Sequence, residues 1–167
     1  MKPILRSILL LFCMGILNSC TVTNIYLVRH GEKQDSSASS GLTPQGEQRA
    51  IALRDVLINE NIDSIYSTDY KRTQLTAKPL ADALKKDIIS YKPDKAFSMK
   101  LKKMKGKNVV VVGHSNTIPD IIKYITTKSI EIRENEFDKL FIIRIRRFLN
   151  LNISLETKTY GEPSPKE

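Results

Sequence analysis

The sequence predicts a three-layer α/β/α sandwich with a largely parallel central sheet and a C-terminal β-hairpin. Two apolar runs, at residues 25–28 and 109–112, are rich in β-branched side chains and have the length of buried strands. Segments with helical apolar spacing separate the strand-like runs, and two further strand-like segments lie near the C terminus. This alternation of strands and helices is typical of a sheet covered on both faces by helices.

Each expected element has its own local signal. Thr43 is suited to cap the first helix, and Pro44 fits its first turn. Pro79 lies inside the second helix and is expected to bend or interrupt it. The expected helices are at residues 44–58, 70–84, 93–106 and 117–125. The expected strands are at residues 25–28, 62–66, 88–91, 109–112, 140–146 and 151–157.

The first twenty residues are expected to lie outside the folded domain. A positively charged start precedes an apolar stretch at residues 8–17, which is short for a membrane span of about 20 residues. The stretch leads into LNSC at 17–20, which resembles a bacterial lipobox. This resemblance implies a lipoprotein signal peptide over residues 1–19 and lipidation of Cys20. The alternative is an ordinary signal peptide, or an uncleaved anchor, that contains a cysteine.

The rest of the chain is expected to form one domain at residues 24–160, after a short tether at 20–23 and before a disordered tail at 161–167. The chain has a net charge of +9, with basic clusters at 95–107 and 144–147. These clusters are either solvated faces or surfaces that attract anionic lipid headgroups or phosphorylated substrates. The sequence shows no nucleic-acid-binding motif, so nucleic acid is not an expected partner. The sequence indicates no particular oligomeric state.

Both histidines of the chain follow apolar runs. His30 comes just after the first run, and His114 comes just after the second. Since the carboxyl ends of parallel strands meet at one edge of an open sheet, where ligands bind, both imidazoles are expected at that edge. Arg29 precedes the first histidine, and Arg72 lies in the first turn of an expected helix. The four side chains form a set suited to binding phosphate.

These residue types match the chemistry of phosphoryl transfer. A neutral imidazole can attack phosphorus, and a phosphohistidine intermediate divides one difficult hydrolysis into two easier steps. Guanidinium groups stabilise the charge that spreads over the oxygens of the transferred group. This arrangement requires neither a metal nor another cofactor, and the sequence offers no acidic cluster typical of a metal site.

Several motifs resemble those of the histidine phosphatase superfamily, also called phosphoglycerate-mutase-like. LVRHGE at residues 27–32 resembles its Arg-His-Gly signature. Its further blocks resemble, in the same order, LTPQG at 42–46, YSTDYKRT at 66–73, VGHSNT at 112–117 and YG at 160–161. The resemblance implies that His30 accepts the phosphoryl group and that Arg29, Arg72 and His114 complete the phosphate pocket.

The acid that protonates the leaving group is left open. Many relatives supply it from the segment after the third strand, where Asp94 is the nearest acid, although capping a helix is the other expected role of Asp94. Another branch uses an aspartate at the position of Ser115, so that route is closed here. Glu32 and Asp69 are the remaining candidates. A substrate with a good leaving group would need no strong acid.

Two polar residues are weaker candidates for contact with the substrate. Ser67 either contacts the substrate or, together with Thr73, caps or orients the helix that carries Arg72. Asn116 either donates to a phosphate oxygen or caps the helix that follows it.

We therefore expect a metal-independent phosphomonoesterase of the histidine acid phosphatase type, acting on a phosphorylated small molecule or phosphoprotein. It is expected to be exported and anchored by lipid to the periplasmic or outer face of a bacterial membrane. One alternative is a lipoprotein that binds a phosphate ligand without catalysis. The other is a phosphoglycerate-type mutase, although the stretch between Arg72 and Gly113 is short for the lid that a mutase would use.

Overall fold

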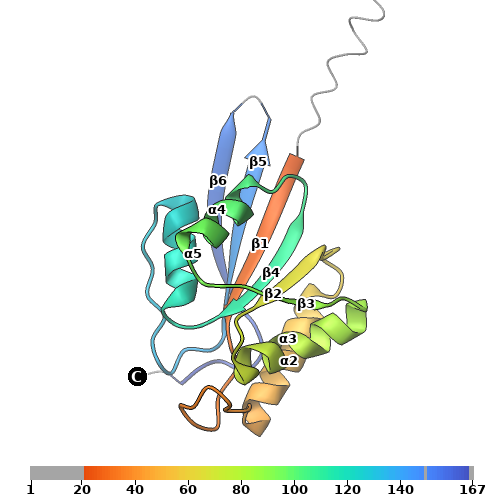
Figure 1. Ribbon diagram of the computed structural model, residues 1–167, viewed down its shortest axis with the longest axis vertical. Helices are drawn as coiled ribbons and strands as arrows, with labels where there is room; N and C mark the ends of the chain where they lie inside the picture. Colours follow the sequence, from red (N-terminus) through yellow and green to blue (C-terminus); the bar gives the residue numbers. More distant parts are fainter. Residues whose placement is uncertain (1–20, 149, 166–167) are drawn as a thin grey trace, which may run out of the picture.

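The computed structural model describes residues 21–148 and 150–165, which form a six-stranded sheet with helices on both faces (Figure 1). The strands are β1 (Thr21–Arg29), β2 (Ser64–Ser67), β3 (Ile88–Ser90), β4 (Asn108–Gly113), β5 (Lys139–Arg147) and β6 (Leu151–Thr159). The helices are α2 (Pro44–Leu57), α3 (Lys71–Leu84), α4 (Lys95–Lys103) and α5 (Thr117–Thr126). The expected α/β fold, with its alternating strands and helices, is confirmed.

The sheet is mixed, whereas the sequence predicted a largely parallel one. Its strand order is β3-β2-β4-β1-β5-β6, and the first four of these strands are parallel. The C-terminal hairpin extends this sheet, because β5 pairs antiparallel with β1 from Thr21↔Arg147 to Val28↔Leu140. β6 then pairs antiparallel with β5. The hairpin was predicted, but its addition to the edge of β1 was not.

Two apolar cores, one on each face of the sheet, explain the uninterrupted apolar runs of β1 and β4. Ile25 and Leu27 of β1 pack in the core that α4 and α5 cover. Tyr26 and Val28 point to the opposite face and pack in the core that α2 and α3 cover. Because successive strand residues face opposite sides, a strand between two helical layers needs apolar side chains at every position.

The helix signals have the expected effects with one exception. The Thr43 hydroxyl accepts a hydrogen bond from the backbone N–H of Gly46 at the start of α2. The Asp94 carboxylate accepts one from the N–H of Phe97 at the start of α4. Pro79, however, lies within a continuous α3, so the expected interruption of that helix is wrong.

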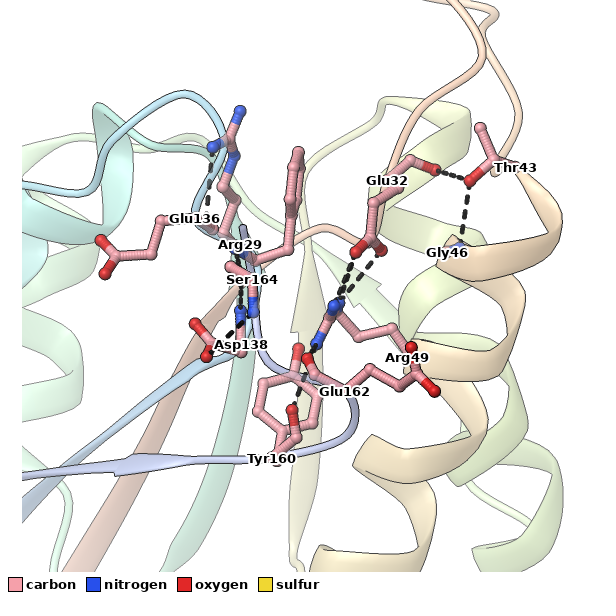
Figure 2. A network of polar contacts seen from close by, with 12 residues as sticks. Arg29, Glu32, Thr43, Gly46, Arg49, Glu136, Asp138, Tyr160, Glu162 and Ser164 are labelled. Carbon is pink, nitrogen blue, oxygen red and sulfur yellow. Dashed lines mark hydrogen bonds and ion pairs between the residues drawn. The ribbon is translucent and has the colours of Figure 1, made fainter. Parts of the chain in front are cut away.

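Both ends of the described domain differ from the prediction. Residues 21–23, expected to form a tether, are the first part of β1 and pair with β5. The tail expected to be disordered is held at Ser164, whose hydroxyl accepts hydrogen bonds from the N–H groups of Phe137 and Asp138 at 2.8 and 3.1 Å (Figure 2). The predicted signal peptide and Cys20 lie outside the described residues. Within residues 21–148 and 150–165, no helix is long and apolar enough to cross a membrane.

Candidate active site

The pairing of β1 with β4 brings the two histidines to one edge of the sheet. Arg29 and Gly113 are partners at the carboxyl ends of these parallel strands. The N–H of His30 donates to the carbonyl of Gly113 at 2.9 Å, which extends the pairing by one residue. The ring centroids of His30 and His114 are 5.3 Å apart. The predicted convergence of two imidazoles thus follows from strand register.

Gly31, which follows His30, lies against the start of α2. A Cβ atom at Gly31 would stand 2.8 Å from the carbonyl oxygen of Gly46. The N–H of Gly31 donates to the Thr76 hydroxyl of α3 at 2.9 Å. Glycine therefore allows the close approach of loop and helix that fixes the backbone beside His30.

His30 is buried and held in one tautomer. Its Nδ1 lies 2.7 Å from the carbonyl oxygen of Gly31, and a carbonyl can only accept, so Nδ1 carries the proton. Nε2 of the neutral ring therefore keeps its lone pair. Burial lowers the pKa of His30 to about 3, and the charge of Arg29 acts in the same direction. His30 is thus a neutral imidazole at neutral pH, the form that a nucleophile requires.

The ring of His114 lies between the Arg72 guanidinium, which can only donate, and the Thr68 hydroxyl, which can accept. Nη2 of Arg72 donates to Nδ1 of His114 in a long contact of 3.5 Å. Since Nδ1 accepts, Nε2 carries the ring proton, and it donates to the Thr68 hydroxyl at 2.9 Å. Burial lowers the pKa of His114 to about 4, with Arg72 as the largest charged contributor. The Arg72 guanidinium also stacks over the Tyr70 ring at 4.3 Å.

Arg29 is anchored by the segment between α5 and β5. Nη1 donates to the carbonyl oxygens of Arg133 and Glu134 at 2.7 and 2.8 Å. Nη2 donates to the Glu134 carboxylate at 3.1 Å. The guanidinium stacks over the Phe137 ring at 4.3 Å. These contacts hold the positive charge at the strand end, next to His30.

A single cavity of about 660 Å³ brings the predicted core together. Its lining includes His30, His114, Arg29 and Arg72, together with Lys33 and Lys92. Nε of Arg29 and Nε of Arg72 are both buried without a hydrogen-bond partner. A buried donor without an acceptor costs about 1–3 kcal/mol. The cavity therefore combines four cationic side chains, two of them with an unsatisfied donor, and two neutral imidazoles.

The weaker candidates are separated by the structure. Asp69 and Asn116 line this cavity, and the side chain of Asn116 makes no capping hydrogen bond. Ser67 does not line it, and its hydroxyl donates to the carbonyl of Thr68 at 2.9 Å. Asp94 does not line it either, because its carboxylate caps α4.

Glu32 is also absent from the cavity lining, because it forms a buried ion pair with Arg49 of α2 (Figure 2). The guanidinium donates to both carboxylate oxygens, with Nη2 2.6 Å from Oε1. Nη1 donates to the carbonyls of Tyr160 and Glu162 at 3.2 and 3.0 Å. Arg49 therefore joins Glu32, near the start of the domain, to the C-terminal tail.

Several residues near the cavity were not predicted. Thr68 and Tyr70 lie in the block at residues 66–73, so the resemblance of that block was a signal that could have found them. Glu134 and Phe137 lie in a segment without periodic apolar spacing and had no such signal. Among the residues that the structure describes, no group of three or more His, Cys, Asp or Glu side chains is placed to hold a metal ion.

Comparison with known sequences points to one family. The model of the histidine phosphatase superfamily (branch 1) matches residues 25–97. A probable phosphoglycerate mutase GpmB from Enterobacter sp. (strain 638) is 40% identical over 72 residues, which are 39% of this chain and 34% of that protein. A probable phosphoglycerate mutase GpmB from Escherichia coli (strain K12 / DH10B) is 39% identical over 72 residues, which are again 39% of this chain and 34% of that protein. The match thus spans about a third of the length of these curated relatives.

Solved structures share the fold over most of both chains. The protein histidine phosphatase SixA complexed with tungstate has a TM-score of 0.65 at 14% identity, covering 81% of this chain and 96% of its own. Bacillus stearothermophilus YhfR has a TM-score of 0.65 at 15% identity, with coverage of 80% and 96%. A putative phosphohistidine phosphatase SixA from Agrobacterium tumefaciens has a TM-score of 0.56 at 16% identity, with coverage of 84% and 98%.

The chain is therefore similar to the histidine phosphatase superfamily, in sequence over residues 25–97 and in fold over most of its length.

Proposed function

We propose that this protein is a histidine phosphatase that hydrolyses phosphomonoesters through a phosphohistidine on His30, without a metal ion. The observation that carries the proposal is the neutral, tautomer-fixed imidazole of His30 in a cavity lined by two buried arginines. The lone pair on Nε2 attacks phosphorus, and the bond from phosphorus to the leaving oxygen breaks. Arg29 and Arg72 stabilise the charge on the transferred group, and water then cleaves the P–N bond.

The substrate class follows from the charge around the cavity. Lys33 and Lys92 line it beside the two arginines and would attract a phosphorylated small molecule or phosphoprotein. The relatives carry two names, phosphohistidine phosphatase and phosphoglycerate mutase. We favour hydrolysis because only residues 91–94 connect β3 to α4, which leaves no inserted lid there to hold a second acceptor hydroxyl.

The test uses the purified full-length protein, an aryl phosphate and a chelator in place of added metal. We expect phosphate release and, after acid quenching, an acid-labile label on the protein from ³²P-substrate. His30→Ala should abolish both while keeping the thermal transition of the wild type. Activity that survives this substitution would contradict the mechanism. Binding of phosphate without label or turnover would favour a binding protein, and transfer to a second hydroxyl in preference to water would favour a mutase.

We also propose that Cys20 carries lipid and anchors the domain to a bacterial membrane. In support, the domain starts with β1 at Thr21, directly after this cysteine, while His30 follows the opposite end of the strand. At about 3.3 Å per residue, the strand would hold the cavity about 30 Å from the anchor. Metabolic labelling with a fatty acid should mark the protein but not Cys20→Ala. Equal labelling of both, or of neither, would contradict the anchor.

A further inference from the structure

Glu134 stands between the two halves of the candidate phosphate pocket. Its Oε2 accepts from Nη2 of Arg29 at 3.1 Å, and its Oε1 accepts from the Ser115 hydroxyl at 3.0 Å. Its own backbone carbonyl accepts from Nη1 of Arg29 at 2.8 Å. The residue is thus tied both to the arginine beside His30 and to the residue that follows His114.

Two carboxylates line the cavity among the described residues, Glu134 and Asp69. Asp69 accepts a hydrogen bond from the hydroxyl of Ser90 in β3. Glu134 contacts Arg29, a member of the phosphate pocket, directly. Its side chain is also 81% exposed, so the carboxyl group lies at the mouth of the cavity. A leaving group must extend through that mouth when the phosphoryl group lies against His30.

We propose, on the basis of the proposed function, that Glu134 is the catalytic acid and base of the two-step hydrolysis. As His30 attacks and the bond to the leaving oxygen breaks, the protonated carboxyl group gives its proton to that oxygen. In the second step the carboxylate takes a proton from the attacking water, whose oxygen bonds to phosphorus as the P–N bond breaks. The proton that left Glu134 is thus restored, and His30 returns to its neutral state.

The contacts of Glu134 supply a way for the carboxylate to gain its proton. In the structure, the Ser115 hydroxyl and the charge of Arg29 lower the pKa of Glu134, so the carboxylate is ionised. A phosphate group bound at Arg29 takes over that positive charge and adds its own negative charge nearby. Both changes favour the protonated carboxyl group. Binding of the substrate thus favours protonation of Glu134 next to the leaving group.

The experiment compares two substrates of the full-length protein that differ in their need for a proton. The leaving group of 2,4-dinitrophenyl phosphate needs none, whereas that of phenyl phosphate does. Since general acid catalysis contributes about 10²–10⁴-fold, Glu134→Gln should lower kcat/KM for phenyl phosphate by about 100-fold. For 2,4-dinitrophenyl phosphate, the rate of the first step should fall by no more than about 3-fold. This rate is measured as the burst of phenolate that is released when the phosphoryl group moves to His30. Asp69→Asn, which removes the other carboxylate of the cavity, should not show this selective loss. Asp82→Asn, at an exposed carboxylate of α3, is the matched control and should change neither rate.

The outcomes separate the role of Glu134 from the proposed function. Glutamine keeps one acceptor oxygen for Arg29, and its amide N–H can donate to the Ser115 hydroxyl. Equal losses on both substrates would therefore mean that Glu134 only positions Arg29, and would overturn the proposal. A selective loss in Asp69→Asn, or a wild type that cleaves only the dinitrophenyl ester, would overturn it as well. In Glu134→Ala, added formate should restore turnover of phenyl phosphate, which a structural role would not allow. The proposed function is tested separately: it fails if His30→Ala retains activity, whatever the result for Glu134.

Discussion

Arg49 and Arg72 are both buried arginines near the carboxyl end of β1, yet their surroundings are opposite. Arg49 has a bidentate carboxylate partner in Glu32 and two backbone carbonyls for its remaining nitrogen. Arg72 donates from Nη1 to the carbonyl of Ser37 and from Nη2 to His114, while its Nε is buried without a partner. The first arginine is saturated and joins parts of the fold. The second has no carboxylate partner among the described contacts and lines the cavity.

Burial alone therefore does not identify an arginine that can bind a ligand. A buried ion pair with every donor satisfied has no capacity left for a ligand. A guanidinium that has no carboxylate partner and lines a cavity beside neutral imidazoles can still bind an anion. If this distinction is right, substitutions at the two arginines will affect different quantities.

Arg49→Met should have the largest effect, and that effect should be on stability. Removing one partner of a buried ion pair typically costs about 3–5 kcal/mol, and here the largely buried Glu32 carboxylate, 13% exposed, would be left unpaired. Urea denaturation should show this loss, while the folded protein keeps the kcat of the wild type at low temperature. The double variant Glu32→Leu/Arg49→Met should recover most of the stability. A single variant as stable as the wild type would remove the basis of the comparison.

Arg72→Ala should have the converse effect. Loss of one preorganised donor to a developing oxyanion typically costs about 10²–10³-fold in kcat, and the urea midpoint should change little. Arg72→Lys should not restore the rate, because an ammonium group lacks the planar fork. A kcat close to that of the wild type in either variant would show that the Arg72 guanidinium does not stabilise the transferred phosphoryl group.

Arg72 and Arg49 should also differ in their effect on the titration of the two histidines. The pKa values of about 3 for His30 and about 4 for His114 lie below the ordinary value near 6.5, so the unfolded chain binds more protons between these values. The neutral rings therefore contribute their full stability above pH 6.5, and this contribution is lost as the pH falls from 6.5 toward 4.

NMR titration of the ring protons should show no inflection above pH 5 for either histidine. Arg72→Ala should raise the pKa of His114, because Arg72 is its largest charged contributor. Arg49→Met should leave both values in place. Midpoints near 6.5 in the wild type would contradict this account of the cavity.

The smallest effect is expected at the tail. Ser164→Ala removes the acceptor for two backbone N–H groups, and a typical hydrogen bond contributes about 1 kcal/mol net. Urea denaturation should show a loss of this order, with kcat unchanged. A loss as large as that of Arg49→Met would mean that the tail, rather than the ion pair, is the main support of this side of the domain.

Local sequence patterns predicted much of the fold and the four core residues, for a physical reason. His30 and His114 follow two apolar runs, and parallel pairing of those runs brings their ends together without further information. Glu134 and Phe137 could not be predicted this way, because their contacts with Arg29 bridge more than 100 residues of chain. The contacts of the tail could not be predicted either, because its glycine and prolines are typical of a loose segment, whereas Ser164 bonds to residues far away in the sequence.

The long-range anchoring of Arg29 also determines when the candidate site can form during synthesis. The partners of its guanidinium are Arg133 and Glu134, and the strand that carries it is flanked by β4 and β5. Such high contact order means that a ribosome must have finished most of the polypeptide before this arginine is immobilised. Nascent or truncated chains that contain His30 therefore lack the fixed charge of Arg29 beside it until synthesis nears completion.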